Sequence, residues 1–277
     1  MICSVVHVTR RSVLRAGGLA AGACALANLL RPNVSHAEPP PAAAAAPTLV
    51  TGSFISAARG GVETKWAIAR PPGQTQPLRA VIALHGHGGS ADSVMELGVP
   101  AALGDLAGAG VPPFAVVSVD GGDTYWHRRA TGSDSGAMVL TELLPMLPAQ
   151  GLDTSRVGFL GWSMGGYGAL LLGARLGPAR TAAICAVSPA LWTGYLPTDD
   201  GAFDNYHDWQ QNTVFGLPAL ASIPLRVDCG TSDRFYAASQ QFVAHLRRPV
   251  AGGFSPGGHD EEFWRSHLPD ELRWLAS

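Results

Sequence analysis

The stretch RVGFLGWSMGGYGALLLGARLG, residues 156–177, decides the predicted fold. Residues 156–161 form a short apolar run of strand type, and residues 165–176 place apolar side chains at helical spacing. Between these runs lies Gly161-Trp162-Ser163-Met164-Gly165, which predicts a strand that turns directly into a helix. Because a chain with 34 glycines can contain this spacing by chance, the flanking runs carry the prediction. We expect Ser163 to lie exposed above the carboxyl edge of a sheet, as a nucleophile would.

The rest of the chain alternates strand and helix patterns from residue 48 onward. A pair of antiparallel strands is expected at 49–56 and 63–70. Apolar runs typical of buried parallel strands follow, with helical patterns at 91–106, 136–147, 165–176, 235–247 and 261–275. The runs are RAVIALHG (79–86), PFAVVSVDGG (113–122), SRVGFLGWS (155–163), RTAAICAVSP (180–189) and IPLRVDCG (223–230). This order predicts one α/β domain over 49–277, with a mostly parallel sheet covered by helices on both faces. Residues 190–224 lack a sheet pattern and are expected to form a modest cap over the active-site rim.

The N-terminal residues have the pattern of an export signal. Residues 1–37 contain Arg10 and Arg11, then a moderately apolar stretch over 13–30 and the small-residue site Ser35-His36-Ala37. This pattern resembles a twin-arginine export signal, which predicts a secreted or cell-envelope protein. Removal of the signal is expected; a retained membrane anchor and lipid attachment at Cys24 are the alternatives. Residues 38–48 form a linker rich in proline and alanine.

The composition limits the classes of partner. Hydrophobic residues make up 47% of the chain and charged residues 14%, as in a globular protein. The formal net charge of −2 offers no electrostatic basis for binding a nucleic acid. After loss of the signal, Cys185 and Cys229 remain. Both lie in strand-like runs, so two buried free thiols are expected, with a disulfide as the alternative.

A serine nucleophile needs a base, and the base needs an acid that orients it. In the α/β-hydrolase plan both follow the serine, in the order acid and then histidine, each just past a strand end. Asp233, in a turn after the run 223–230, is the favoured acid; Asp228 lies inside that run and is the rival. His259 is the favoured base, because His245 and His267 lie on helical patterns.

Backbone N–H groups should stabilise the negative charge that develops on the ester carbonyl oxygen. Met164, directly after the nucleophile, is expected to supply one and His87, in the glycine-rich stretch LHGHGGS (84–90), the other. His85 and His87 also have the spacing of a metal-ligand pair, but the stretch that follows adds no further Asp or His. We therefore expect neither a metal nor a cofactor. The candidates for the substrate pocket are Tyr125, Trp126, His127, Trp162, Trp192 and Tyr195.

Six stretches together resemble the esterase branch of the α/β-hydrolase superfamily, which includes S-formylglutathione hydrolase (esterase D) and the secreted mycolyltransferases. They are HGHGG (85–89), VDGGDTYWH (119–127), GWSMGGYGAL (161–170), SPALW (188–192), DCGTSDRFY (228–236) and GGHDEEFW (257–264). The resemblance implies carboxylester or thioester chemistry with Ser163, His259 and Asp233 as the catalytic triad. Two departures matter. Mycolyltransferases use glutamate as the acid, where this sequence has Asp233, and S-formylglutathione hydrolases are usually cytosolic, whereas this chain carries an export-type signal.

The sequence thus favours a secreted serine carboxylesterase that hydrolyses short to medium acyl esters, as small molecules or lipids, through an acyl-enzyme. A cell-envelope acyltransferase with a sugar hydroxyl as acceptor is one alternative. A non-enzymatic binding protein on a hydrolase scaffold is another. The complete serine, aspartate and histidine set argues against the last of these.

Overall fold

The computed structural model describes residues 48–196, 198–199 and 201–277. The predicted export signal and nearly all of the linker lie outside the described residues. The described part contains one sheet of eight strands in the order β1-β2-β4-β3-β5-β6-β7-β8. The strands are β1 (Thr48–Ser56), β2 (Val62–Arg70), β3 (Leu78–Leu84), β4 (Ala115–Val119), β5 (Leu152–Trp162), β6 (Thr181–Val187), β7 (Leu225–Gly230) and β8 (Ala251–Ser255). Strand β2 pairs antiparallel with β1 and β4, and all other pairs are parallel.

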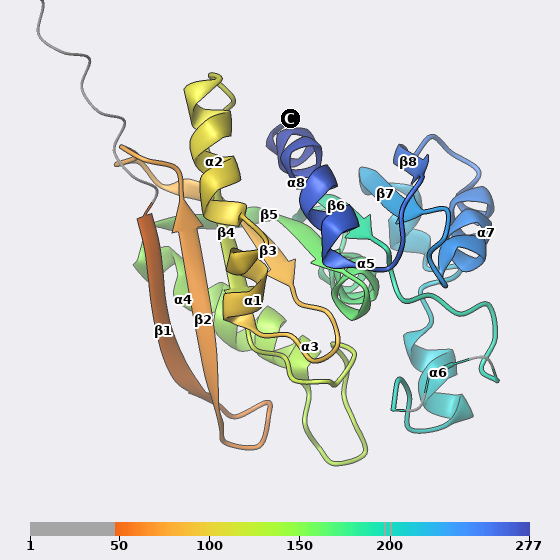
Figure 1. Cartoon of the computed structure of the whole chain (residues 1–277). Coiled ribbons are helices and arrows are strands. Elements are labelled where there is room, and N and C mark those ends of the chain that lie inside the picture. Colours follow the sequence, from red (N-terminus) through yellow and green to blue (C-terminus); the bar gives the residue numbers. More distant parts are fainter. Residues whose placement is uncertain (1–47, 197, 200) are drawn as a thin grey trace, which may run out of the picture. The chain divides into compact units, whose positions relative to one another are not determined.

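Helices cover both faces of this sheet, as the alternation along the chain predicts. Figure 1 shows α1, α2 and α8 on the near side of the sheet and α3, α4 and α5 on the far side. The helices are α1 (Ala91–Glu96), α2 (Val99–Gly108), α3 (Ser135–Ala137), α4 (Leu144–Met146), α5 (Met164–Leu176), α6 (Tyr206–Asn212), α7 (Tyr236–Leu246) and α8 (Glu261–Ala276). A π-helical segment (Met138–Leu143) joins α3 to α4, and 3₁₀ turns follow at Leu147–Gln150 and Pro218–Ala221.

The pleat of the central strands explains why two hydrophobic cores form. Ile82 and Phe159 belong to the core beneath α5, whereas their chain neighbours Val81 and Leu160 belong to the core beneath α1, α2 and α8. Successive residues of a strand point to opposite faces, so a strand that is apolar throughout must be covered twice. All of these side chains are fully buried.

The structure corrects three local predictions. The helix expected over 91–106 is two helices, since Gly98 between them has φ 108°, a backbone conformation outside the helical region. The helix expected over 136–147 contains π and 3₁₀ turns. Strand β8 was not predicted, because AGGFS lacks the β-branched residues that mark the other strands. None of the helices in the described part of the chain is both long and apolar enough to cross a membrane.

Candidate active site

Ser163 occupies the turn between strand β5 and helix α5, as the sequence predicts. Its φ is 55°, in the left-handed region that non-glycine residues rarely adopt. A Cβ added to Gly161 would stand 2.1 Å from the carbonyl oxygen of Gly165, and one added to Gly165 would stand 1.9 Å from that of Leu84. Only glycine fits at these two positions, because backbone atoms already fill the space that a side chain would take. The turn therefore holds the Ser163 side chain away from both elements.

His259 joins Ser163 to Asp233. Its Nε2 lies 2.8 Å from the Ser163 Oγ, and its Nδ1 lies 2.8 Å from the Asp233 Oδ2. A carboxylate can only accept, so Nδ1 carries the proton and Nε2 is free to take one from the serine. Asp228 does not contact His259; its carboxylate pairs with Arg226 and accepts a hydrogen bond from the Gly253 N–H. The geometry thus selects Asp233 over Asp228 as the partner of His259.

The environment of Asp233 keeps its carboxylate ionised. Burial alone would raise the pKa of Asp233, but hydrogen bonds from His259 and from the Phe235 N–H more than offset it, so the pKa lies below its ordinary value. The Phe235 N–H lies 2.8 Å from Oδ1, and the Asp233 side chain is fully buried. A charged carboxylate at this place stabilises a positive imidazole ring.

The loop after strand β3 lies directly beside the serine. A Cβ on Gly86 would stand 3.5 Å from the Ser163 Cβ. Within the described part of the chain, neither the His87 N–H nor the Met164 N–H donates a hydrogen bond to another residue. Two N–H groups of this kind next to a serine are suited to hold a developing oxyanion.

His85 anchors this loop rather than facing a ligand. Its Nε2 accepts a hydrogen bond from the Gly121 N–H at 2.9 Å, so its Nδ1 carries the proton and donates to the Gly86 carbonyl oxygen at 2.7 Å. Burial lowers the pKa of His85, which favours this neutral form. With both ring nitrogens engaged, His85 has none left for a metal. Among the residues that the structure describes, no group of three or more His, Cys, Asp or Glu side chains is arranged to hold a metal ion.

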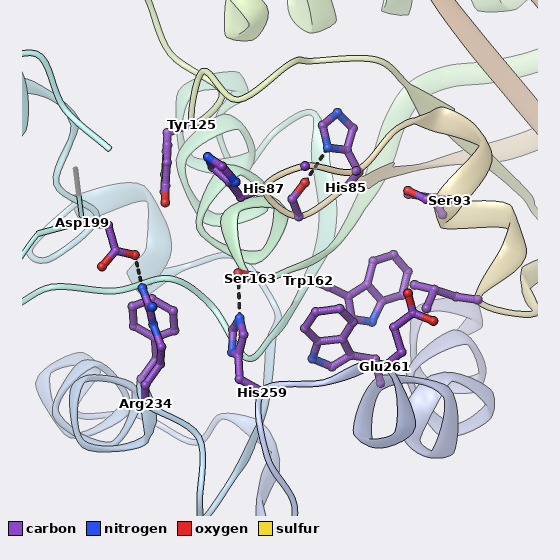
Figure 2. Close-up of a pocket in the computed structure, with 17 residues that line it drawn as sticks. His85, His87, Ser93, Tyr125, Trp162, Ser163, Asp199, Arg234, His259 and Glu261 are labelled. Atoms are coloured by element: carbon purple, nitrogen blue, oxygen red, sulfur yellow. Dashed lines mark hydrogen bonds and ion pairs between the residues drawn. The ribbon is translucent and has the colours of Figure 1, made fainter. Parts of the chain in front are cut away.

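A cavity of about 540 Å³ opens around Ser163. In Figure 2, Tyr125, Asp199 and Arg234 lie on one side of Ser163 and His259, and Trp162 and Glu261 lie on the other. The lining residues are His85, Gly86, His87, Gly88, Gly89, Ser93, Val94, Leu97, Tyr125, Trp162, Ser163, Asp199, Arg234, Phe235, His259, Glu261 and Trp264. The cavity therefore combines aromatic and aliphatic walls with charged groups.

Only two of the six pocket candidates from the sequence, Tyr125 and Trp162, line this cavity. Trp126 and His127 are fully buried beneath the loop, and the His127 Nε2 lies 3.2 Å from the Asp208 carboxylate. The expectation that they face substrate is therefore wrong. A loop aromatic gives the same sequence signal whether it packs inward or outward.

The predicted cap also differs from expectation. Among its described residues, only Asp199 lines the cavity. Trp192 is buried behind the cavity wall, with its ring centroid 5.6 Å from that of Tyr125 and 5.5 Å from that of Phe235. Tyr195 packs against Tyr206 instead. The large side chains of the segment divide between the core and the surface, since Trp192 and Phe203 are buried whereas Leu196 and Tyr206 are exposed.

Sequence reasoning missed several cavity residues that come from distant segments. Val94 and Leu97 come from the region of α1, Trp264 from α8, and Arg234 and Phe235 from the turn after Asp233. The His259 ring lies between two of the aromatic side chains, with centroids 5.3 Å from Phe235 and 5.4 Å from Trp264. The sequence offered one signal for Arg234, Phe235 and Trp264, which is that they lie close in the chain to Asp233 or His259.

The sequence profile of the family described as "Putative esterase" matches residues 57–275. The chain belongs to this esterase family. Its members share the α/β-hydrolase fold seen here, and membership supports ester hydrolysis by this chain. No curated protein matches the chain.

Solved structures of esterases and related hydrolases share the fold. A ferulic acid esterase has a TM-score of 0.71 and 22% identity over 83% of this chain and 98% of its own. A fluorophosphonate-binding serine hydrolase of Staphylococcus aureus has a TM-score of 0.72 and 17% identity, over 84% of this chain and 99% of its own. An S-formylglutathione hydrolase of Agrobacterium tumefaciens has a TM-score of 0.70 and 20% identity, over 84% of this chain and 96% of its own. At these identities the likeness establishes the fold alone.

Proposed function

We propose that this esterase-family protein is a serine carboxylesterase that works through an acyl-enzyme on Ser163. The observation that carries the proposal is the pair of 2.8 Å contacts that join Ser163, His259 and Asp233, with Ser163 and His259 lining a cavity. A serine hydroxyl becomes an effective nucleophile when a positioned imidazole removes its proton. The free N–H groups of His87 and Met164 support the same assignment.

The first half of the reaction forms the acyl-enzyme. The Ser163 Oγ attacks the carbonyl carbon of the ester while its proton passes to the His259 Nε2. An electron pair of the C=O bond moves onto the oxygen, and the His87 and Met164 N–H groups donate hydrogen bonds to the oxyanion that forms. The Asp233 carboxylate stabilises the imidazolium that results. The tetrahedral intermediate then collapses, and the alcohol leaves with the proton from His259.

The second half repeats these steps with water. His259 takes a proton from a water molecule, whose oxygen attacks the acyl carbon. Collapse of the second intermediate returns the proton to Ser163 and releases the carboxylic acid. The site is therefore restored without a cofactor.

Soluble esters with short to medium acyl groups are the proposed substrates. The apolar part of the cavity comes from Val94, Leu97, Trp162 and Trp264, with Glu261 on the same side as Trp162, whereas Asp199 and Arg234 bring charge to the opposite side (Figure 2). A long acyl chain would have to lie against these charged groups, at a cost in desolvation. The ferulic acid esterase and the S-formylglutathione hydrolase named above have the same fold and are named for compact acyl groups.

Ser163→Ala tests the mechanism. Loss of the nucleophile should lower kcat for p-nitrophenyl butyrate on the order of 10⁶-fold. A serine-directed fluorophosphonate should label the wild type and not the variant, while thermal unfolding stays cooperative in both. Full labelling of the variant would show that Ser163 is not the nucleophile.

Export through a twin-arginine signal is a separate proposal. It rests on Arg10 and Arg11 and the small-residue site that ends at Ala37. Replacing both arginines by lysine should retain the protein in the cytoplasm of a host that has the twin-arginine pathway. Unchanged export of the doubly substituted chain would contradict the proposal.

A further inference from the structure

Tyr125 stands on a backbone that is costly to form. Its φ is 53°, and that of Trp126 is 57°, so two successive non-glycine residues occupy the left-handed region. Such conformations persist where the surrounding structure imposes them, and they gather at functional sites. Ser163 is another residue in this state. The strained backbone therefore suggests a functional role for the Tyr125 side chain.

Trp126 is locked in place and so sets the direction of Tyr125. The Trp126 side chain is fully buried. A Cβ added to Gly121 would stand 2.5 Å from the Trp126 ring, and one added to Gly168 would stand 2.3 Å from it. A Cβ added to Gly136 would stand 2.5 Å from the Trp126 carbonyl oxygen. Gly121 and Gly168, from two separate segments, thus leave room for one large side chain, which cannot exchange places with its neighbour.

The Tyr125 ring is held from behind as well. Its centroid lies 5.6 Å from that of Trp192 and 6.2 Å from that of Tyr167, and the residue is 4% exposed. Its carbonyl oxygen accepts a hydrogen bond of 2.9 Å from the His127 Nδ1. Side chains that are fixed in this way can recognise a ligand without losing further conformational freedom on binding.

The phenol hydroxyl is the part of Tyr125 that remains available. It has no hydrogen-bond partner among the described residues, and the side chain lines the cavity that contains Ser163. Burial, and then the negative charge of Asp199, raise the pKa of Tyr125 to about 12, so the hydroxyl keeps its proton and can donate. Figure 2 shows this hydroxyl pointing into the cavity, on the side of Asp199 and Arg234.

The side of the cavity formed by Tyr125, Asp199 and Arg234 is better suited to bind a hydroxyl group than an anion. Arg234 can donate hydrogen bonds, Asp199 can accept them, and the two form an ion pair. An anionic ligand would meet repulsion from Asp199, whereas a hydroxyl group can both donate and accept. Trp162, on the opposite side of Ser163, offers an apolar wall.

We propose that Tyr125 is a specificity-determining residue whose phenol O–H binds a hydroxyl group of the ester substrate, next to the Arg234–Asp199 pair. The inference rests on the proposed esterase function and narrows it to hydroxyl-bearing esters. A phenolic acid or a polyol alcohol can present such a hydroxyl, and the substrate pairs below separate these two sources.

The test compares esters that differ by their hydroxyl groups. Methyl cinnamate is paired with methyl 4-hydroxycinnamate for the acid part, and ethyl butyrate with glycerol monobutyrate for the alcohol part. The wild type should have the higher kcat/KM for the hydroxylated member of at least one pair. Tyr125→Phe should reduce that preference about tenfold, as expected for a lost hydrogen bond. Its kcat/KM for the plain member should stay within about twofold of the wild type.

Tyr167→Phe is the matched control. Tyr167 belongs to the same aromatic cluster, but its hydroxyl donates to the Asn212 carbonyl oxygen at 2.7 Å. Its removal should leave the substrate preference unchanged. An equal loss on both members of a pair in Tyr125→Phe would overturn the proposal, since the phenol would then act on the reacting carbonyl or on the fold. No loss on any hydroxylated ester would overturn it as well.

These outcomes are distinct from failure of the esterase mechanism. If Ser163→Ala keeps its turnover and its phosphonate label, the proposed function is wrong regardless of Tyr125. If Ser163→Ala is inactive and Tyr125→Phe has no selective effect, only the substrate class is wrong.

Discussion

Gly165 lies so close to Leu84 that a Cβ on Gly165 would stand 1.9 Å from the Leu84 carbonyl oxygen. The first turn of α5, which follows Ser163, thus rests on the end of β3, which leads into the loop of His85 and His87. This contact brings together the two parts of the chain that supply the candidate oxyanion donors. It also explains why a glycine stands two residues after Ser163.

Gly165→Ala should therefore destabilise the fold. The obstacle is a backbone carbonyl that cannot rotate away, so we expect a loss of about 3 kcal/mol or more in the free energy of unfolding. For a domain of this size that loss lowers the Tm by roughly 6–12 °C. Gly108→Ala is the control, because nothing lies within 4 Å of a Cβ at that position in α2. Equal melting temperatures for both variants would contradict the steric account.

Asp233→Asn should slow catalysis and leave the fold intact. An amide in place of the carboxylate can donate to the His259 Nδ1, so the ring adopts the wrong tautomer. Loss of the acid in such a triad lowers kcat on the order of 10⁴-fold. Steady-state kinetics with p-nitrophenyl butyrate measures the effect.

Asp228→Asn provides the contrast. Asp228 links β7 to β8 through the Gly253 N–H, at 3.2 Å, and it pairs with Arg226. We expect this variant to lose stability and to keep far more of its activity than Asp233→Asn. The reverse order of kcat values would mean that the acid is assigned to the wrong residue.

Glu271 should make stability fall as the pH rises. Both of its carboxylate oxygens are buried without a hydrogen-bond partner among the described residues. Burial, and then the charge of Asp228, raise the pKa of Glu271 well above its ordinary value, although Arg226 opposes this. The unfolded chain releases this proton near the ordinary carboxyl pKa, while the folded protein keeps it. The stability that Glu271 supplies is therefore complete below that pKa and is lost as the pH rises toward the folded-state value.

Glu271→Gln should remove this dependence. Its Tm should match that of the wild type near pH 4 and exceed it increasingly at neutral and alkaline pH, because the amide has no proton to hold. Glu262→Gln, an exposed position on the same helix, is the control. Curves of Tm against pH that stay parallel for Glu271→Gln and the wild type would show that Glu271 is ionised when folded.

The enzyme should prefer p-nitrophenyl esters of short to medium acyl chains. The charged side chains of Asp199, Arg234 and Glu261 at the cavity interrupt the broad apolar face that long chains need. kcat/KM should be measured for p-nitrophenyl esters with acyl chains of two to sixteen carbons (lengths chosen for the assay). It should be highest in the shorter half of this series, and the rate should not rise when the substrate forms micelles. A maximum at the long end with activation at an interface would contradict this.

The sequence by itself determined the strand–turn–helix around Ser163 and pointed to Asp233 and His259. Those signals are local: two glycines with no room for a Cβ, an apolar run before them and a helical period after them. The same reasoning reached the α/β alternation and the antiparallel opening pair. It did not reach β8, whose glycines carry no strand signal, although β8 pairs with β7 and leads to His259.

Only the tertiary structure decided the walls of the cavity and the order of the strands. Strand β4 inserts between β2 and β3, an arrangement that depends on pairing between segments far apart in the chain. Trp264 reaches the site because α8 packs there, whereas Trp126, next to Tyr125 in the sequence, packs inward where Gly121 and Gly168 leave space for it. Local patterns record what each segment does with its own neighbours in the chain. Which side chain fills which space depends on volumes that distant segments create together.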